Sequence, residues 1–331
     1  MTPEKARALL ASLGPSLDPM AALLSWRELT PKERERVQTS GGTKLQKAEA
    51  AGVYVRSAGQ HVGRLTEIDP PPLALFHWGA EHVLERSCLA IVGTREASTY
   101  GLAAALSFAK FCAAQGVTIV SGGALGIDAA AHRGALEVGG RTVAVLGTGI
   151  DKPYPAQNAP LLREISKSGL VLSQFALGTP SYPNNFLLRN RLIAAVADAV
   201  LVIEAPERSG AISTATAAAE FNRPVFVVPG NITNYRFKGS HALVRDGASL
   251  VDSPAQIMEE LGWGFSEAEP APPLDDPAAE ALRQALISEP LTAEAIAMKT
   301  GQTTEQVLTG LTLLELEGLV LRTATGYALK S

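Results

Sequence analysis

The sequence predicts an α/β protein with a Rossmann-like, doubly wound parallel sheet, flanked by a small helical domain at the N-terminus and a winged-helix domain at the C-terminus. Three observations predict this architecture. Short capped helical segments fill residues 1–50, apolar β-rich runs alternate with helix-length stretches over residues 87–252, and three helical segments followed by two short strands occupy residues 278–331.

The N-terminal segments "TPEKARALLASLG", "LDPMAALLSWREL" and "TPKERERVQT" each have Thr or Asp near a Pro at their start. This is a common way for a helix to begin. We therefore expect a small helical domain, of the SAM or helix-hairpin-helix kind, over residues 1–50. Residues 51–86 are less regular, and the triple proline at 70–72 favours an extended segment.

Six apolar runs follow one another in the central region: "CLAIVG", "VTIVS", "TVAVLG", "LVLSQ", "AVLVIEA" and "PVFVVPG". Apolar strands that alternate with helices indicate a parallel sheet covered on both faces. Right-handed crossovers then give a doubly wound domain. We place this domain at residues 51–263, with its core at 87–252.

The C-terminal region begins with an acidic, proline-bearing stretch, residues 264–277, which is typical of a linker. Beyond it, "LTAEAIAMKTG" and "TTEQVLTGLTLLELEGLV" predict a helix, a turn and a second helix, and "LVLRTATGYALK" predicts a two-stranded wing. Residues 278–331 therefore form the expected winged-helix domain.

Composition restricts the possible functions. A net charge of −4 argues against a protein that binds nucleic acid over most of its surface. Residues 259–280, however, hold seven acidic residues and no Lys or Arg, so a basic patch elsewhere is compatible with the total charge. Cys88 and Cys112 lie in apolar segments, which predicts buried free thiols and excludes a disulfide scaffold. Neither a signal peptide nor an apolar run of membrane-spanning length is present, so we expect a cytoplasmic protein.

The loops that follow parallel strands form the ligand crevice of such a sheet. In "VGTREAS", Gly93 permits a close turn and Arg95 is placed to hold a phosphate through paired donors, unless it forms only a surface salt bridge. In "SGGALGID", a strand breaks into glycines and restarts as a helix, a pattern that leaves amides facing an anion. Asp128 stands in the first turn of that helix, where a structural role is the simpler explanation.

Two further segments carry polar groups to the same edge. In "FLLRNR", Arg189 and Arg191 diverge on a helix, so one can contact phosphate while the other braces the sheet. Phe186 before them is expected to stack on a base, and a core position is the alternative. In "ERSGAIST", Ser209 and Gly210 offer an amide and a hydroxyl group at a helix start.

The sequence offers no pattern for catalysis, a metal or a cofactor. The five His and two Cys are scattered without ligand spacing, no G-x-G-x-x-G fingerprint or P-loop occurs, and no nucleophile and base are paired by spacing. His132, on an Ala-rich helix, is expected to be packed. We therefore expect a binding protein that is not an enzyme and uses neither metal nor cofactor.

Taken together, these motifs resemble the bacterial DNA-processing protein A family (DprA, also called Smf). The shared motifs stand here, in order, as "GTR", "SGGALGIDAAAHRGAL", "AVLGTGIDKPYP", "RNRLIA", "EAPERSG" and "VFVVPG". The resemblance implies a homodimer, joined through the α/β domain, that protects incoming single-stranded DNA and loads the recombinase RecA on it in natural transformation. The implied DNA-binding residues are Gly93, Arg95, Ser121, Gly122, Gly123, Gly126, Asp128, Phe186, Arg189, Asn190, Arg191, Ser209 and Gly210.

Three departures from the family pattern accompany the resemblance. Leu125 stands where the family often has Arg, Leu187 replaces the usual Pro, and the loop "GNITNYRFKGSHALVRDGA" differs from the family's Gly-x-Asn. Arg236 and Lys238 in that loop either replace lost positive charge or are simply solvated.

Two other function classes remain as alternatives. Nucleotide phosphoribohydrolases of the lysine-decarboxylase-like type share the glycine-rich fold, but they carry a P-G-G-x-G-T-x-x-E stretch that this chain lacks. A DNA-binding regulator led by the winged helix would need a basic recognition helix, and "TEQVLTGLTLLELEG" has no Lys or Arg. This favours protein contact or weak duplex binding by that domain.

Overall fold

The computed structural model of the chain describes residues 49–57, 64–65, 68, 72, 74–265, 274, 276–286, 290–317, 319–323 and 326–329. The chain divides into two compact units, residues 1–265 and residues 266–331. The small helical domain expected at residues 1–50 lies outside the described residues except for its last two positions. Most of the expected linker, residues 264–277, lies outside them as well.

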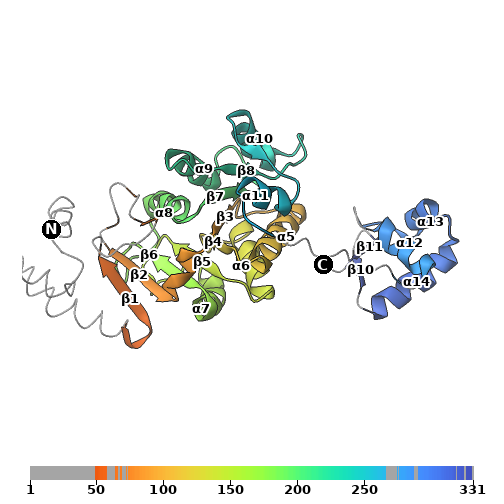
Figure 1. Cartoon of the computed structure of the whole chain (residues 1–331), viewed down its shortest axis with the longest axis horizontal. Coiled ribbons are helices and arrows are strands. Elements are labelled where there is room, and N and C mark those ends of the chain that lie inside the picture. The colour runs from red at the N-terminus through yellow and green to blue at the C-terminus, as the bar shows by residue number, and fades with distance from the viewer. Residues whose placement is uncertain are drawn as a thin grey trace, which may run out of the picture. The chain divides into compact units, whose positions relative to one another are not determined.

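The first unit is built on a nine-stranded sheet with the order β1-β2-β6-β5-β4-β3-β7-β8-β9 (Figure 1). All six predicted strands are present, and with the short strand β9 they form the parallel part of the sheet. The mostly parallel α/β fold is therefore confirmed. The parallel strands are β3 (Cys88–Val92), β4 (Thr118–Ser121), β5 (Thr142–Leu146), β6 (Leu170–Ser173), β7 (Ala199–Val202), β8 (Val225–Val227) and β9 (Ser249–Leu250).

Two antiparallel strands extend one edge of the sheet, β1 (Val53–Ser57) and β2 (Ala74–Gly79). They fall in the region that the sequence presented only as irregular. β2 pairs with β6, and this pairing, rather than a strong local pattern, makes "ALFHWG" a strand.

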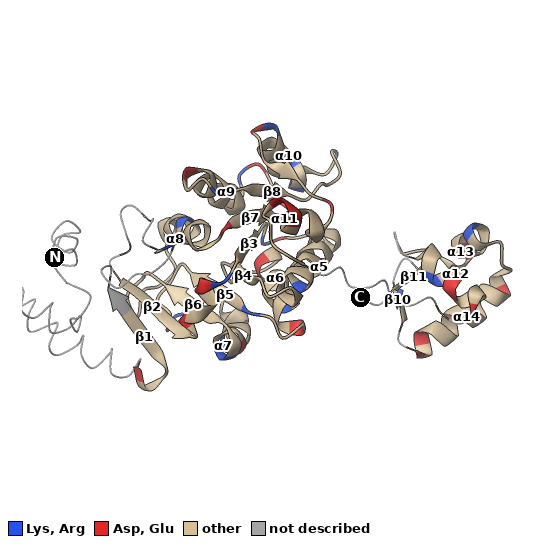
Figure 2. Ribbon diagram, viewed as in Figure 1, with Lys and Arg blue, Asp and Glu red and all other residues tan. Residues whose placement is uncertain are grey.

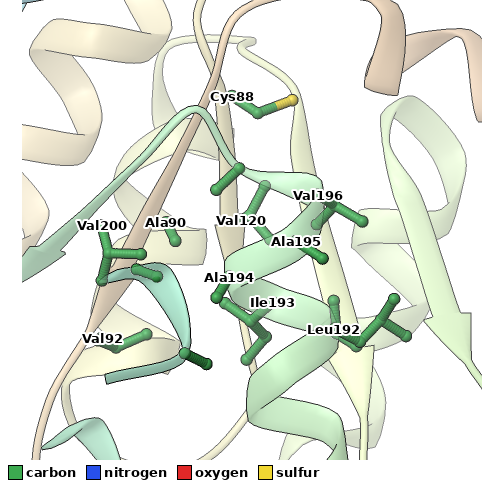
Figure 3. Close-up of a cluster of buried hydrophobic side chains, with 14 of the residues drawn as sticks. Cys88, Ala90, Val92, Val120, Leu192, Ile193, Ala194, Ala195, Val196 and Val200 are labelled. Atoms are coloured by element: carbon green, nitrogen blue, oxygen red, sulfur yellow. The ribbon is translucent and has the colours of Figure 1, made fainter. Parts of the chain in front are cut away.

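Helices cover both faces of the sheet. Alternate residues of β3 point to opposite sides: Ala90 and Val92 pack with α8 and α9, whereas Leu89 and Ile91 pack with α5, α6 and α11. Figure 3 shows the first of these clusters, where Leu192–Val196 of α8 lie over Ala90, Val92 and Val120. The helices are α5 (Thr99–Ala114), α6 (Ile127–Glu137), α7 (Ala159–Ser168), α8 (Pro183–Val196), α9 (Gly210–Glu220), α10 (Lys238–Arg245) and α11 (Pro254–Glu260), with 3-10 turns η4 (Glu81–Glu85), η5 (Ala156–Asn158) and η6 (Tyr235–Phe237).

The strand order fixes where a ligand crevice can form. β3 lies between β4 and β7, so the chain leaves β3 toward one side of the sheet and returns at β7 on the other side. The loops that follow β3 and β7 therefore leave the carboxyl ends of these two strands in opposite directions. This place is the topological switch point of a doubly wound sheet.

The second unit has the predicted winged-helix elements: α12 (Pro277–Ala285), α13 (Ala293–Thr300), α14 (Thr304–Leu316), β10 (Val320–Thr323) and β11 (Gly326–Leu329). Thr292 and Thr303 cap α13 and α14 through their side chains. A separate core that includes Leu282, Ile296 and Leu311 holds the three helices together.

Two expectations from composition can be examined in the same structure. Cys88 and Cys112 are buried free thiols, as predicted. Among the described residues, no helix combines the length and the apolar character needed to cross a membrane.

Candidate nucleic-acid interface

A cavity of about 390 Å³ lies at the switch point. Four segments that are distant in the sequence form its wall: residues 92–96 after β3, the start of α6, the first half of α8, and residues 206–214 at the start of α9. Eight of the predicted site residues line it: Gly93, Arg95, Asp128, Phe186, Arg189, Asn190, Ser209 and Gly210. Ser121, Gly122, Gly123, Gly126 and Arg191 do not line this cavity.

The glycine loop after β4 differs from the expectation of amides left bare for an anion. The amides of Gly122 and Ala124 donate to Asp128 Oδ2 at 3.1 and 3.3 Å, and the amide of Ile127 donates to the Thr94 carbonyl at 3.3 Å. These three amides are occupied within the protein. Asp128 therefore has the structural role that the sequence favoured.

The glycines of this loop instead permit close packing. A Cβ on Gly122 would overlap the Arg189 guanidinium, and one on Gly126, whose φ is +74°, would overlap the Thr94 carbonyl oxygen. The buried Asn158 donates to the carbonyls of Gly123 and Ala124 at 2.9 and 3.0 Å. No pattern in the sequence indicates these two hydrogen bonds, because Asn158 lies in the turn before α7 and not in the glycine loop.

Arg189 is buried at 5 % exposure, although it reaches the cavity wall. Its Nη1 donates to the carbonyls of Gly122 and Val145, and its Nε donates to Asn190 Oδ1. Arg189 thus ties the carboxyl ends of β4 and β5 to α8, which makes it the bracing arginine of the "RNR" pair.

Asp128 and Arg189 form a coupled buried pair. Burial raises the pKa of the Asp128 carboxyl group, and the positive charge of Arg189 opposes that shift. Burial likewise lowers the pKa of Arg189, and the Asp128 charge opposes it. Each charge is therefore compensated by the other in the floor of the site.

Arg191 lies elsewhere. Its guanidinium pairs with Glu220 of α9 and stacks over the Phe221 ring at 4.8 Å. It does not line the cavity, so the structure gives it no place beside the other candidate residues.

Arg95 is exposed and forms no ion pair with any described residue. Its guanidinium lies 5.2 Å from the centroid of the half-buried Phe186 ring. An exposed guanidinium held against an aromatic ring keeps its donors available for an anion.

The start of α9 supplies the other side of the cavity. Ser209 caps the helix by accepting from the Ala211 amide, and Asn190 Nδ2 donates to the Gly210 carbonyl and to Ser213 Oγ. Arg208 is exposed here, lines the cavity, and also lacks an ion pair with any described residue. Arg208 is not among the predicted site residues, although "ERSG" places it directly before the helix start.

The loop between β8 and α10 reaches the rim of the site. Arg236 lies 3.5 Å from the fully buried Glu204 carboxylate, and its Nε donates to the Glu96 carbonyl at 3.1 Å. Glu204 also accepts from the amide and hydroxyl group of Ser98. Arg236 is therefore neither simply solvated nor a free cation, because it ties this loop to residues 96–98.

Among the described residues, no histidine or cysteine lines the cavity. His132 is buried away from the cavity, its Nδ1 lies 2.7 Å from Thr142 Oγ1, and burial lowers its pKa to about 3. Within the described part of the chain, no group of three or more His, Cys, Asp or Glu residues is arranged to hold a metal ion.

Comparison with known proteins agrees with this arrangement. Residues 53–262 match the family described as DNA recombination-mediator protein A, and residues 266–326 match the DprA winged helix domain. The chain is 40 % identical over 276 residues to the putative DNA processing protein DprA of Mycobacterium tuberculosis (78 % of this chain, 71 % of the relative). It is 38 % identical over 266 residues to protein Smf of Escherichia coli (77 % and 71 %).

Two solved structures are similar to the chain. DNA processing protein A from Streptococcus pneumoniae superposes with a TM-score of 0.63 at 34 % identity, covering 76 % of this chain and 88 % of that protein. DNA processing protein A from Helicobacter pylori, whose single-stranded-DNA binding mode has been described, has a TM-score of 0.59 at 28 % identity, with 65 % and 97 % covered.

Proposed function

This chain belongs to the DNA recombination-mediator protein A family (DprA/Smf), and from that premise we propose that it binds single-stranded DNA in the switch-point cavity. The observation that carries the proposal is the pair of exposed arginines on the wall, Arg95 after β3 and Arg208 before α9, neither of which forms an ion pair with a described residue. They flank an interior in which the two buried charges, Asp128 and Arg189, compensate one another, and the exposed Glu96 is the other charged residue on the wall.

The two arginines suit the backbone of a nucleic acid better than a free nucleotide. Each presents a planar set of donors to one phosphate, and they stand on different loops of the same edge. Arg95 lies beside Phe186, whose ring in turn packs against that of Tyr154, so a base next to a held phosphate meets an aromatic cluster. Bases are available for such contact only in a single strand.

The test is a titration of the whole protein with single-stranded and double-stranded oligonucleotides at two salt concentrations, followed by fluorescence anisotropy. We expect tighter binding to the single strand, and an affinity that falls as salt rises because counterions are released from the phosphates. Preference for duplex, or an affinity that does not change with salt, would refute the proposal.

We further propose, on the family relationship, that the bound strand is protected and passed to RecA during natural transformation, and that the protein acts in the cytoplasm as a homodimer. Strand exchange by RecA on DNA precoated with a single-strand-binding protein tests the transfer step. Addition of this protein should shorten the lag before exchange begins. No change in the lag, with DNA binding intact, would remove RecA loading from the proposal.

We expect no catalytic turnover, because no hydroxyl group of the described cavity wall is hydrogen-bonded to a carboxylate or a histidine. Incubation with nucleoside monophosphates and with end-labelled DNA, followed by chromatography, is the check. Release of free base at enzyme-like rates would instead favour a nucleotide phosphoribohydrolase.

A further inference from the structure

A second, smaller recess of about 60 Å³ adjoins the cavity. Four residues line both: Arg95, Ala124, Phe186 and Arg189. The second recess is completed by Gly122 and Leu125 from the glycine loop and by Tyr154 and Pro155 from the loop after β5. Arg95 and Phe186 therefore form the partition between the two hollows.

The ring of Phe186 has little free surface for a base. The Arg95 and Arg189 guanidinium groups lie 5.2 and 5.7 Å from its centroid, and the Tyr154 ring lies 5.6 Å away at 49°. A Cβ on Gly147 would fall 2.7 Å from Phe186 Cδ1, so the ring also rests on that backbone. Phe186 is surrounded mainly by protein groups, and this arrangement makes it a support.

Tyr154, by contrast, presents an open ring. It is 44 % exposed, and its hydroxyl group makes no hydrogen bond to a described residue. A recess of 60 Å³ has room for a few water molecules rather than a base. A base at this position would lie across the mouth of the recess, against the Tyr154 ring.

The loop that carries Tyr154 is held in place at several points. The Gly178 amide donates to Asp151 Oδ1 at 2.7 Å, and the Gly149 amide donates to the Thr179 carbonyl at 2.9 Å. The Asn158 amide donates to the Pro155 carbonyl at 3.1 Å. An aromatic ring held in this way loses little freedom when a base stacks on it.

We propose that Tyr154 is a second base-stacking position, next to the cavity and supported by Phe186. The proposal rests on the proposed single-stranded-DNA function and deepens it. A strand held by Arg95 continues from the cavity across the Arg95–Phe186 partition, and its next base stacks on Tyr154. The two hollows then bind neighbouring nucleotides, with Arg95 at the phosphate between them.

The test compares the whole protein with three variants, Tyr154→Leu, Tyr154→Phe and Tyr182→Leu. Tyr182 is the matched control, because it is 56 % exposed and lines neither hollow. Affinity is measured by anisotropy for an ordinary single strand and for a strand of the same length without bases. We expect Tyr154→Leu to bind the ordinary strand about tenfold more weakly, while Tyr154→Phe and Tyr182→Leu bind like the wild type.

On the strand without bases, Tyr154→Leu should match the wild type, since the phosphate contacts are unchanged. A second measurement does not depend on the fold of a variant: ultraviolet irradiation of the wild type with a strand containing 5-iododeoxyuridine should crosslink Tyr154, as located by mass spectrometry.

The outcomes separate the two proposals. If the wild type fails to bind single strands, the proposed function is wrong. If it binds, but Tyr154→Leu binds the ordinary strand equally well and Tyr154 is not crosslinked, only the stacking position is wrong.

Discussion

At the residue scale, the site depends on a buried arginine that the sequence could not distinguish from a surface one. Arg189 and Arg191 stand two positions apart with the same chemistry, yet Arg189 is enclosed by carbonyl groups and Arg191 pairs with Glu220. Helical spacing predicts that the two diverge, but only the packing of α8 on the sheet decides which one turns inward. The sequence therefore predicted two roles and left their assignment open.

Gly122 is required by this arrangement. Gly122→Ala would place a methyl group in the position of the Arg189 guanidinium and 2.7 Å from Asp128 Oδ2. We expect a loss of about 1–3 kcal/mol in the free energy of unfolding, as for other overpacked interiors. Urea unfolding measures it. Gly264→Ala is the control. Open space surrounds that position, so the free energy of unfolding of this variant should equal that of the wild type. Equal stability of both variants would show that Arg189 can move aside.

His132 gives the fold a pH dependence with a defined sign. Its pKa in the folded protein is about 3, below the ordinary value of 6.5, so the unfolded chain binds a proton that the folded protein does not. His132 therefore lowers stability as pH falls from about 6.5 toward 3, by up to roughly 1.4 kcal/mol per pH unit, and has no such effect above that window.

The measurement compares urea unfolding of the wild type and of His132→Gln at several pH values. The difference between the two isolates His132 from Asp128, whose raised pKa acts in the opposite direction. The variant should show a shallower loss of stability in acid. Parallel curves would mean that His132 does not stay neutral in the folded protein.

At the scale of elements, β3 to β8 could be predicted because each is a short apolar run followed by glycine or a polar loop, whereas the two-residue strand β9 (Ser249–Leu250) has no such run. The loops after β3, β4 and β7 could be placed at one edge for the same reason. β1 and β2 could not be predicted, since the pairing of β2 with β6 and of β1 with β2, rather than their own pattern, makes them strands. The occupied amides of the glycine loop could not be predicted either, because Asp128 competes for them only once α6 has folded back.

The helix α14 is poorly suited to binding phosphate. It has no Lys or Arg, and its exposed side chains include Glu305, Glu315, Leu313 and Leu316, the last at 80 % exposure (Figure 2 shows the acidic residues in red). A recognition helix that enters a DNA groove normally carries donors and positive charge. This composition favours a protein partner for the surface of α14.

A chain ending at Phe265 tests whether the winged-helix domain contributes to DNA binding. Because residues 1–265 and 266–331 have separate cores, we expect the shortened chain to fold and to bind single-stranded DNA with the affinity and salt dependence of the full chain. Anisotropy titration is the measurement. A tenfold or larger loss of affinity would place part of the DNA-binding surface on the winged helix.

At the scale of the whole molecule, the two units differ in charge. Residues 266–331 hold ten Asp and Glu residues against four Lys and Arg, so the negative net charge of the chain arises from this unit, and the remainder is slightly positive. The overall net charge of −4 is therefore a poor guide to the binding surface. A basic site on the first unit is compatible with an acidic protein.

The family relationship leads us to expect dimerisation through the first unit. Static light scattering should give twice the chain mass for the full protein and also for the chain ending at Phe265. A monomeric shortened chain from a dimeric parent would transfer the interface to the C-terminal residues.

The claim that Arg95 and Arg208 hold the DNA backbone is tested most directly by the salt dependence of their variants. Each phosphate contact on a single strand contributes about 0.7 to the slope of log affinity against log salt. The double variant Arg95→Ala, Arg208→Ala should therefore bind more weakly and show a slope smaller by about 1.4, whereas Arg191→Ala, which removes an exposed pair outside the cavity, should keep the wild-type slope. A double variant with the wild-type affinity and slope would contradict the account, because the strand would then lie elsewhere on the protein.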